Sequence, residues 1–230
     1  MKRDLLDRLL LARQQKQPAA HLRWLAQARE MLVVGDEVDE LASNEAETVR
    51  KALRLDRGLS VETDDGVLFV QPFNPPLRLI VVGAVHIAQA LVPMASLAGY
   101  EVIVVDPRRA FASDRRFPDV AVSQDWPDEA LEALMIDART AVVTLTHDPK
   151  LDDPALDVAL KSPAFYIASL GSRRTHAARR ERLGVLGHGE ETLDRIHGPA
   201  GLSLGAVSPA EIAVSVMAEM TQVLRAKDAA

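Results

Sequence analysis

The sequence predicts an α/β protein of Rossmann-like type, with a doubly wound and mostly parallel sheet, preceded by a small α+β region. From residue 77 onward, near-continuous runs of β-branched and aliphatic residues alternate with amphipathic stretches. This is the pattern of strands covered by helices on both faces. Upstream the alternation is missing, and Asn74-Pro75-Pro76 extends neither a strand nor a helix, so we place a boundary there. The predicted regions are 1–76 and 77–230.

The first 76 residues predict two helices, a short strand and a hairpin. Four leucines between residues 5 and 10 follow helical spacing, and a second amphipathic helix is expected over 44–53. The run MLVV at 31–34 predicts a short strand. The Asp65-Gly66 turn stands between two β-type runs and predicts a hairpin.

The second region predicts five strands in an order typical of a doubly wound sheet. Their sequences are LRLIVVG, EVIVVD, RTAVVTLT, AFYIASL and the shorter DVAV at 119–122. Right-handed crossovers then gather the loops that follow the strands along one edge of the sheet. We expect any functional site at that edge.

Helices are expected between these strands and at the end of the chain. The final helix is the best defined, because Ser208, Pro209 and Glu211 form a helix start with a capping box. The glycines at 198, 201 and 205 precede it and are expected to bring an irregular segment back to the sheet edge. The expected helix ranges are 86–97, 127–136, 152–161 and 208–226.

The loop after the first strand of this region is similar to a dinucleotide-binding glycine fingerprint in which one glycine is replaced. Gly83 permits the tight turn, Val85 stands in the place of the second glycine, and Ala88 in that of the third. A branched side chain at the second place obstructs close approach of a pyrophosphate. Asp106 ends the next strand, where a ribose-binding carboxylate is expected. The alternative is that Gly83 only ends a strand and Asp106 only caps a loop.

Two further loops are expected at the same edge. THDPKLDD places His147 and Asp148 after one strand, and GSRRT places Ser172 and Arg173 at the start of a helix after another. Free N–H groups, the helix dipole and a guanidinium group all favour a phosphate. The alternatives are that His147 only bonds a backbone carbonyl and that the later arginines form a solvated helical face.

Composition narrows the function classes further. The 230 residues include no cysteine, which excludes disulfides, thiolate nucleophiles and cysteine-ligated metal sites. The formal net charge of −6 argues against non-specific binding to nucleic acid. No segment approaches 18 uncharged apolar residues, and the N-terminus has no small-residue cleavage site. We therefore expect a cytoplasmic protein without membrane contact, and we predict no metal site.

Seven motifs taken in order resemble the C-terminal Rossmann domain of the XdhC/CoxI family: GAVHIA, VVDPR, FPD, THD, YIASLGSRRT, GPAGLSLGA and SPAEIAVSVMAE. The resemblance runs from Pro75 to the end of the chain. It implies a non-catalytic chaperone that binds molybdenum cofactor, protects it while the sulfido ligand is installed, and delivers it to a molybdenum hydroxylase. The implied partners are a hydroxylase of the xanthine dehydrogenase or carbon monoxide dehydrogenase type, and a cysteine desulfurase.

The resemblance also implies which residues bind the cofactor, and it shows where this chain departs from the family. The family pattern has Gly-Ala-Gly-His where this chain has Val85 between Ala84 and His86, and its upstream Gly-Ser-Ala-Pro-Arg and Ser-Gly-Gly-Cys segments are missing here. Without a thiolate, the chain would hold the pterin phosphate end alone or act beside a longer relative. The implied cofactor-binding residues are Gly83, Ala84, His86, Asp106, His147, Asp148, Gly171, Ser172, Arg173 and Arg174.

Two other functions stay open from the residues. In an NAD(P)-dependent oxidoreductase, Asp106 would bind ribose and His147 would donate a proton, although no second catalytic residue is evident. In an adaptor without a ligand, the shortened N-terminal region would dock a molybdoenzyme. The apolar surface of the first and last helices suggests a homodimer.

Overall fold

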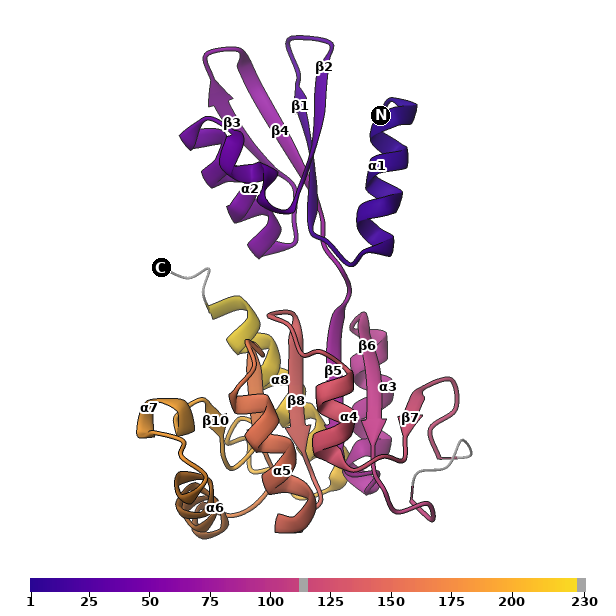
Figure 1. Cartoon of the computed structure of the whole chain (residues 1–230), viewed down its shortest axis with the longest axis vertical. Coiled ribbons are helices and arrows are strands. Elements are labelled where there is room, and N and C mark those ends of the chain that lie inside the picture. The colour runs from indigo at the N-terminus through magenta and orange to yellow at the C-terminus, as the bar shows by residue number, and fades with distance from the viewer. Residues whose placement is uncertain (112–115, 227–230) are drawn as a thin grey trace. The chain divides into compact units, whose positions relative to one another are not determined.

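The computed structural model describes residues 1–111 and 116–226. The chain divides into two compact units, Met1–Pro75 and Pro76–Ala230, and each has its own sheet and hydrophobic core (Figure 1).

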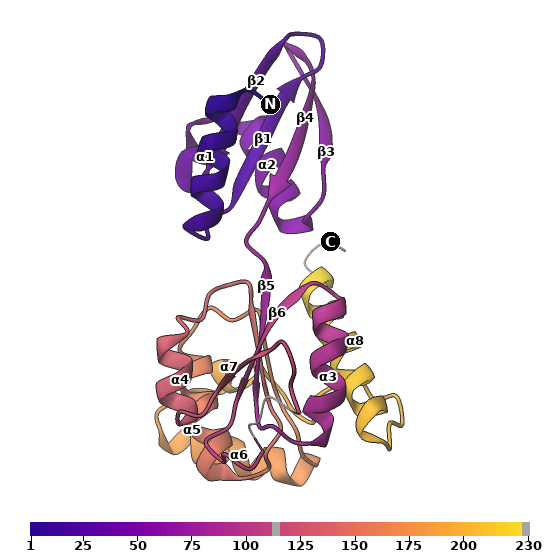
Figure 2. The ribbon, with the colours of Figure 1, turned by 90° about the vertical axis from the view of Figure 1, so that its right-hand side faces the viewer.

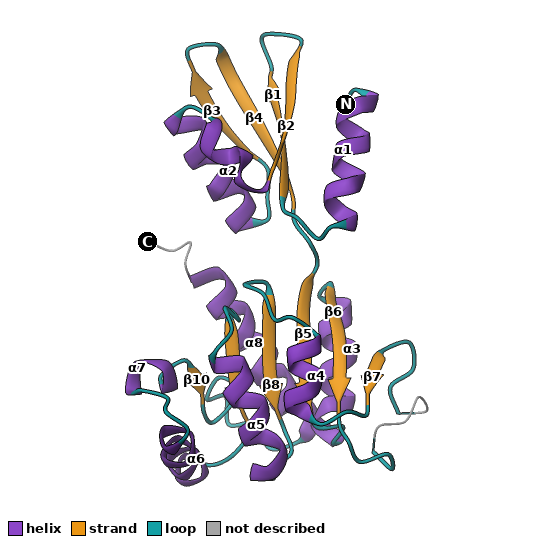
Figure 3. Ribbon diagram, viewed as in Figure 1, coloured by secondary structure: helices purple, strands orange, loops and turns teal. Residues whose placement is uncertain are grey.

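The N-terminal unit is built on a four-stranded antiparallel sheet in the order β2-β1-β4-β3 (Figure 3). The Asp65-Gly66 turn joins β3 to β4, which is the predicted hairpin. The elements are α1 Arg3–Gln14, β1 Ala19–Trp24, β2 Arg29–Val34, the 3-10 helix η1 Gly35–Glu40, α2 Ser43–Leu55, β3 Leu59–Thr63 and β4 Gly66–Phe73.

The central strand β1 was not predicted from the sequence. Polar His21 and Arg23 interrupt its apolar pattern, yet four of its first five residue positions are buried because helices cover both faces of the sheet. The side of α2 that carries Ala46 and Val49 packs with Leu22 of β1, whereas α1 packs with Ala19 on the other face. His21 is satisfied in this setting by an interaction of its Nε2 with the Glu30 carboxylate at 2.9 Å.

The C-terminal unit alternates strands and helices as the sequence predicts. Its elements are β5 Leu77–Val82, α3 His86–Leu97, β6 Tyr100–Val105, β7 Ala121–Ser123, α4 Pro127–Ala133, β8 Thr140–Thr144, α5 Pro149–Leu160, β9 Tyr166–Ser169, α6 Arg173–Val185, α7 Glu190–Leu193, β10 Ile196–His197 and α8 Pro209–Ala226.

Six parallel strands form the sheet of this unit, in the order β10-β9-β8-β5-β6-β7. From β5 the chain moves outward through β6 to β7, and it then crosses back to β8 on the other side of β5. This is the Rossmann strand order, and the change of direction falls between β5 and β8. The predicted fold class is therefore confirmed.

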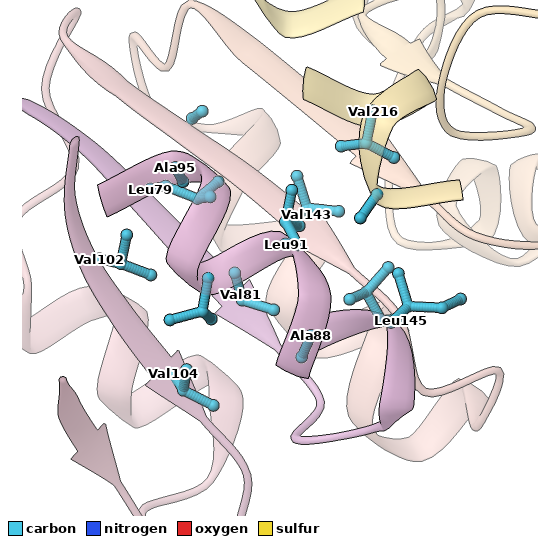
Figure 4. Packing of buried hydrophobic residues seen from close by; sticks show 14 of the residues in the cluster. Leu79, Val81, Ala88, Leu91, Ala95, Val102, Val104, Val143, Leu145 and Val216 are labelled. Carbon is cyan, nitrogen blue, oxygen red and sulfur yellow. The ribbon is translucent and has the colours of Figure 1, made fainter. Parts of the chain in front are cut away.

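Two hydrophobic clusters cover the two faces of this sheet. On one face, α3 and α8 pack against Leu79 and Val81 of β5, and Figure 4 shows Leu91 of α3 among them. On the other face, α4, α5 and the Leu183 side of α6 pack against Ile80 and its neighbours. Figure 2 shows α3 and α8 on the opposite side of the sheet from α4 and α5.

Two helix boundaries differ from the prediction, and each has a local cause. Helix α4 ends at Ala133 rather than 136, because Met135 adopts a left-handed backbone with φ of 45°. The Arg78 guanidinium supports this geometry by donating to the carbonyls of Leu134 and Met135 at 2.8 Å. Helix α5 begins at Pro149 rather than 152, because the Asp148 side chain caps it by accepting from Lys150 N–H.

Candidate functional site

The loop after β5 brings the chain from the sheet into α3. Gly83 has φ of +110°, and a Cβ placed there would lie 2.6 Å from Cγ2 of Thr146 in the loop after β8. The loops after β5 and β8 therefore touch at the change of direction of the sheet, and only glycine fits at position 83 without strain. Val85 follows as the N-cap of α3, and His86 is the exposed first residue of the helix. The N–H groups at this helix start favour a negative charge.

Asp106 at the end of β6 is buried and holds this loop in place. One carboxylate oxygen accepts from Ala84 N–H at 2.8 Å and from Arg108 Nη2 at 2.8 Å. The other oxygen accepts from the Arg108 backbone N–H at 3.0 Å and from its Nε at 2.9 Å. Burial by itself raises the pKa of Asp106, but the hydrogen bonds from Arg108 and Ala84 outweigh it and keep the pKa below its usual range.

A buried carboxylate holds the loop after β8 in place. Asp152 is 1% exposed and accepts from the Thr146 hydroxyl at 2.7 Å and from the His147 N–H at 3.1 Å. His147 itself is exposed and has φ of +62°, a left-handed conformation that costs a non-glycine residue about 1–2 kcal/mol. Such strain persists where the surroundings enforce it, and it occurs often at functional sites. Asp148 is exposed beside it and caps α5.

The loop after β9 leads into α6. Gly171 has φ of +143°, and a Cβ there would lie 3.1 Å from the Thr175 side chain. Ser172 caps the helix by accepting from Thr175 N–H at 3.1 Å. The next two residues, Arg173 and Arg174, are both exposed. Later in α6, Arg180 and Arg182 form ion pairs with carboxylates of the same unit, so their roles are structural.

Two buried charged groups, Asp152 and Arg179, interact electrostatically behind the loops after β8 and β9. Arg179 of α6 is 2% exposed and donates from Nη2 to the Leu170 carbonyl at 2.8 Å, but its Nε and Nη1 have no hydrogen-bond partner within the described residues. Burial lowers the pKa of Arg179, while the carboxylates of Asp152 and Asp153 act in the opposite direction. Burial likewise raises the pKa of Asp152, against its hydrogen bonds from Thr146 and the positive charge of Arg179.

The glycine-rich segment before α8 is fastened to the sheet by Glu219. Its carboxylate accepts from the Tyr166 hydroxyl at 2.6 Å and from Gly201 N–H at 2.9 Å, and it pairs with His197 Nδ1 at 3.2 Å. Burial raises the pKa of Glu219, but the hydrogen bonds from His197 and Tyr166 outweigh it and lower the pKa. Burial and the neighbouring Glu219 both raise the pKa of Tyr166.

The structure thus brings some of the predicted cofactor-binding residues together. The loops carrying Gly83 and His147 meet through Thr146, and Asp106 is bonded to Ala84. No hydrogen bond between this group and the residues at 171–174 occurs in the described part of the chain, where the connection is the electrostatic one between Asp152 and Arg179.

The sequence pattern did not reveal the roles of Asp152, Arg179 and Glu219. Each stands in a helix, where a charged residue is ordinarily exposed, and no motif in the sequence marks it as buried.

A metal centre and a membrane-spanning helix are both absent from residues 1–111 and 116–226. Within these ranges, no group of three His, Asp or Glu side chains is placed to hold a metal ion. No helix there combines the length and the apolar character needed to cross a membrane.

The fold and the candidate site define a Rossmann-type domain that presents strand-end loops at the carboxyl edge of a parallel sheet. The family model for the XdhC Rossmann domain matches residues 79–220, which is more than half of the chain. The chain belongs to the XdhC family, as its motifs indicated.

Three bacterial relatives are similar to this chain over about two thirds of its length. The "Molybdenum cofactor insertion chaperone PaoD" of Escherichia coli K12 is 33% identical over 151 residues, 66% of this chain and 41% of the relative. The "Uncharacterized protein YqeB" of the same organism is 34% identical over 158 residues, 68% and 29% of the two chains. A probable xanthine dehydrogenase component of Bacillus subtilis 168 is 34% identical over 159 residues, 67% and 45% of the two chains. The match spans less than half the length of each relative.

A crystal structure described as a xanthine dehydrogenase from Bacillus halodurans has a similar fold. The TM-score is 0.71 with 24% sequence identity, and the alignment covers 98% of this chain and 65% of that chain. At this identity the likeness shows the fold alone.

Proposed function

We propose that this protein is an accessory protein that binds molybdenum cofactor at the carboxyl edge of its parallel sheet and delivers it to a molybdenum hydroxylase. Membership of the XdhC family and similarity to the insertion chaperone PaoD support the proposal. The client would be of the xanthine dehydrogenase type, in keeping with the name of the Bacillus subtilis relative.

The observation that carries the proposal is the contact of the two strand-end loops at the change of direction of the sheet. Gly83 lies against Thr146, and this contact places the exposed His86 and His147 on adjoining loops. In doubly wound sheets, ligands bind in the crevice at this point. Asp152 holds the left-handed backbone of His147 in place, so the exposed imidazole is presented in a fixed loop conformation.

The side chains present fit an anionic pterin. His86, His147 and Asp148 supply exposed donors and acceptors for a polar heterocycle, and Arg173 at the start of α6 supplies positive charge for a phosphate. Bound cofactor would supply the molybdenum centre that the client enzyme uses. The protein residues bind and orient it, and no step in this role requires a bond in the cofactor to break. These 230 residues contain no cysteine, so a thiolate ligand or sulfur donor has to come from another protein.

The oxidoreductase alternative is weakened by Asp106. Its carboxylate is buried and accepts four hydrogen bonds, two at each oxygen, so no lone pair is left for ribose hydroxyl groups. The ligand-free adaptor has no specific observation in its favour, since the strand-end loops carry exposed polar side chains.

The test is anaerobic titration calorimetry of the protein with molybdenum cofactor, and separately with NAD(H) and NADP(H). We expect saturable binding of molybdenum cofactor, weakened in the double variant His86→Ala/His147→Ala, in which both side chains are exposed. Lys161→Ala is the matched control, because this exposed cation follows the last turn of α5 at the other edge of the sheet.

Binding of NAD(H) or NADP(H) in place of the cofactor would favour the oxidoreductase, and no binding of either would favour the adaptor. A protein that binds the cofactor should also activate cofactor-free xanthine dehydrogenase faster than free cofactor does. If the protein binds the cofactor but does not activate the enzyme, its role would be limited to cofactor storage.

A further inference from the structure

A cavity of about 400 Å³ lies at the carboxyl end of β9, beneath the glycine-rich segment at 199–206. Its walls are Leu170 and Gly171, this segment, and Ile212 and Ser215 of α8. The volume falls within the range of roughly 300–1,000 Å³ that small-molecule sites occupy. The proposed function assigns no role to the segment at 199–206.

The charged side chain that lines this cavity is positive. Arg173 is the one charged side chain in its lining, which contains no carboxylate, and within the described residues the Arg173 guanidinium has no hydrogen bond or ion pair. Behind the wall, Arg179 donates to the Leu170 carbonyl, and two of its buried nitrogens stay unpartnered within the same residues. The positive charge of Arg179 is already offset by the neighbouring carboxylates of Asp152 and Asp153, so Arg173 is the cation available to a ligand in the cavity.

The segment over the cavity is bonded to β9 and α8 at its start, and several of its later N–H groups are free within the described residues. Ala200 N–H donates to the Ser169 carbonyl at 3.1 Å, and Leu202 N–H donates to the Ser215 carbonyl at 3.2 Å. At Gly201, with φ of +91°, a Cβ would lie 2.3 Å from Ser215 Oγ, so glycine is required for this close approach to α8. In the described part of the chain, the N–H groups at 203, 205 and 206 have no partner.

We propose that this cavity binds a phosphate monoester or diphosphate group, with Arg173 and the N–H groups of residues 203, 205 and 206 as its donors. We take this phosphate group to be the phosphate-bearing end of the molybdenum cofactor, and this part of the inference rests on the function proposed above. The pterin end then lies toward the loops that carry His86 and His147. A preorganised arrangement of N–H donors and one guanidinium is a common way to bind phosphate.

The test compares Arg173→Ala with Arg174→Ala, two exposed neighbours at the start of the same helix, of which only Arg173 lines the cavity. The first arm uses inorganic pyrophosphate, with affinity from calorimetry and location from backbone amide shifts in NMR spectra. We expect Arg173→Ala to weaken binding about tenfold or more, as expected for loss of a charge-assisted hydrogen bond, and Arg174→Ala to change it less than about twofold. The shifts should concentrate on residues 203–206.

Equal losses in the two variants, or shifts centred on the start of α3 instead, would overturn the inference, and so would an absence of pyrophosphate binding. The second arm repeats the titration with molybdenum cofactor. Cofactor binding that ignores Arg173→Ala would overturn the inference and leave the proposed function standing. Pyrophosphate binding that depends on Arg173, without cofactor binding, would support the cavity and remove the cofactor as the source of the phosphate.

Discussion

Replacing Asp106 by asparagine tests whether this carboxylate is a structural anchor of the loop after β5. The side chain is 0% exposed and accepts from Ala84 N–H and from three donors of Arg108. Asparagine has nearly the same shape but only one oxygen. In either orientation of its amide, the NH₂ group faces two N–H donors, and two hydrogen bonds are lost.

The loss of folding free energy in Asp106→Asn depends on which of the four donors can bond to water instead. The Arg108 side chain is 36% exposed, so water can replace the bonds from its guanidinium and their loss costs little. The amide orientation that leaves its oxygen on the buried Ala84 N–H is therefore favoured, and it loses the bonds from the Arg108 backbone N–H and Nε. The lost backbone bond to a charged group costs about 1.5–3 kcal/mol, so we expect Asp106→Asn to destabilise the C-terminal unit by about 2 kcal/mol.

The assay is hydrogen–deuterium exchange with mass spectrometry, since it reports separately on peptides from β5, β6 and α3. Asp125→Asn is the control, because this exposed aspartate loses the same charge but bonds only within its own turn. Loss of protection within about 0.5 kcal/mol of the control would refute the reasoning. The pKa of Asp106 is lowered in the folded protein, so its stabilisation is present above the unfolded pKa and is lost as pH falls through the folded pKa. The two proteins should therefore converge in acid.

Three further outcomes follow from the site. Gly83→Ala should cost about 2–4 kcal/mol through strain and overlap with Thr146, and Thr146→Ser, which removes the overlapping methyl group, should recover part of this loss in chemical denaturation. Glu219→Gln should lower the melting temperature at neutral pH, and the difference from the parent should shrink as pH falls through the lowered pKa of this carboxyl, as scanning calorimetry can show. Val85→Gly should create no NADH binding in a fluorescence titration, because Asp106 remains engaged; saturable binding would show that the valine was the obstacle.

The fold of the C-terminal unit could be predicted because its strands are buried on both faces and its helices carry one apolar side. The run from Leu77 to Val82 allows no other interpretation in this context. Strand β1 could not be predicted, since His21 becomes acceptable inside only when Glu30 from the neighbouring strand bonds it. That contact is formed between two strands in the folded structure, and the local pattern of residues around His21 does not predict it.

The candidate site was predictable to a similar degree, and for the same reason. The sequence located Gly83 and His147 because parallel strands end at one edge of a sheet. It did not show that Asp152 fixes the His147 backbone or that Arg179 lies behind Gly171. Both are charged residues in helices, and only the packing of α5 and α6 against the sheet makes them buried.

The structure also changes how Val85, at the second glycine position of the fingerprint, should be interpreted. Val85 has φ of −91°, which any residue adopts, and its partly buried side chain packs against the core under α3. The backbone there does not need glycine, so valine by itself is a weak argument against a nucleotide. The stronger argument is Asp106, whose four acceptor positions are already filled by Ala84 and Arg108. A ligand at this edge must therefore be recognised by the exposed loops and by positive charge, and both requirements suit an anionic pterin better than a ribose.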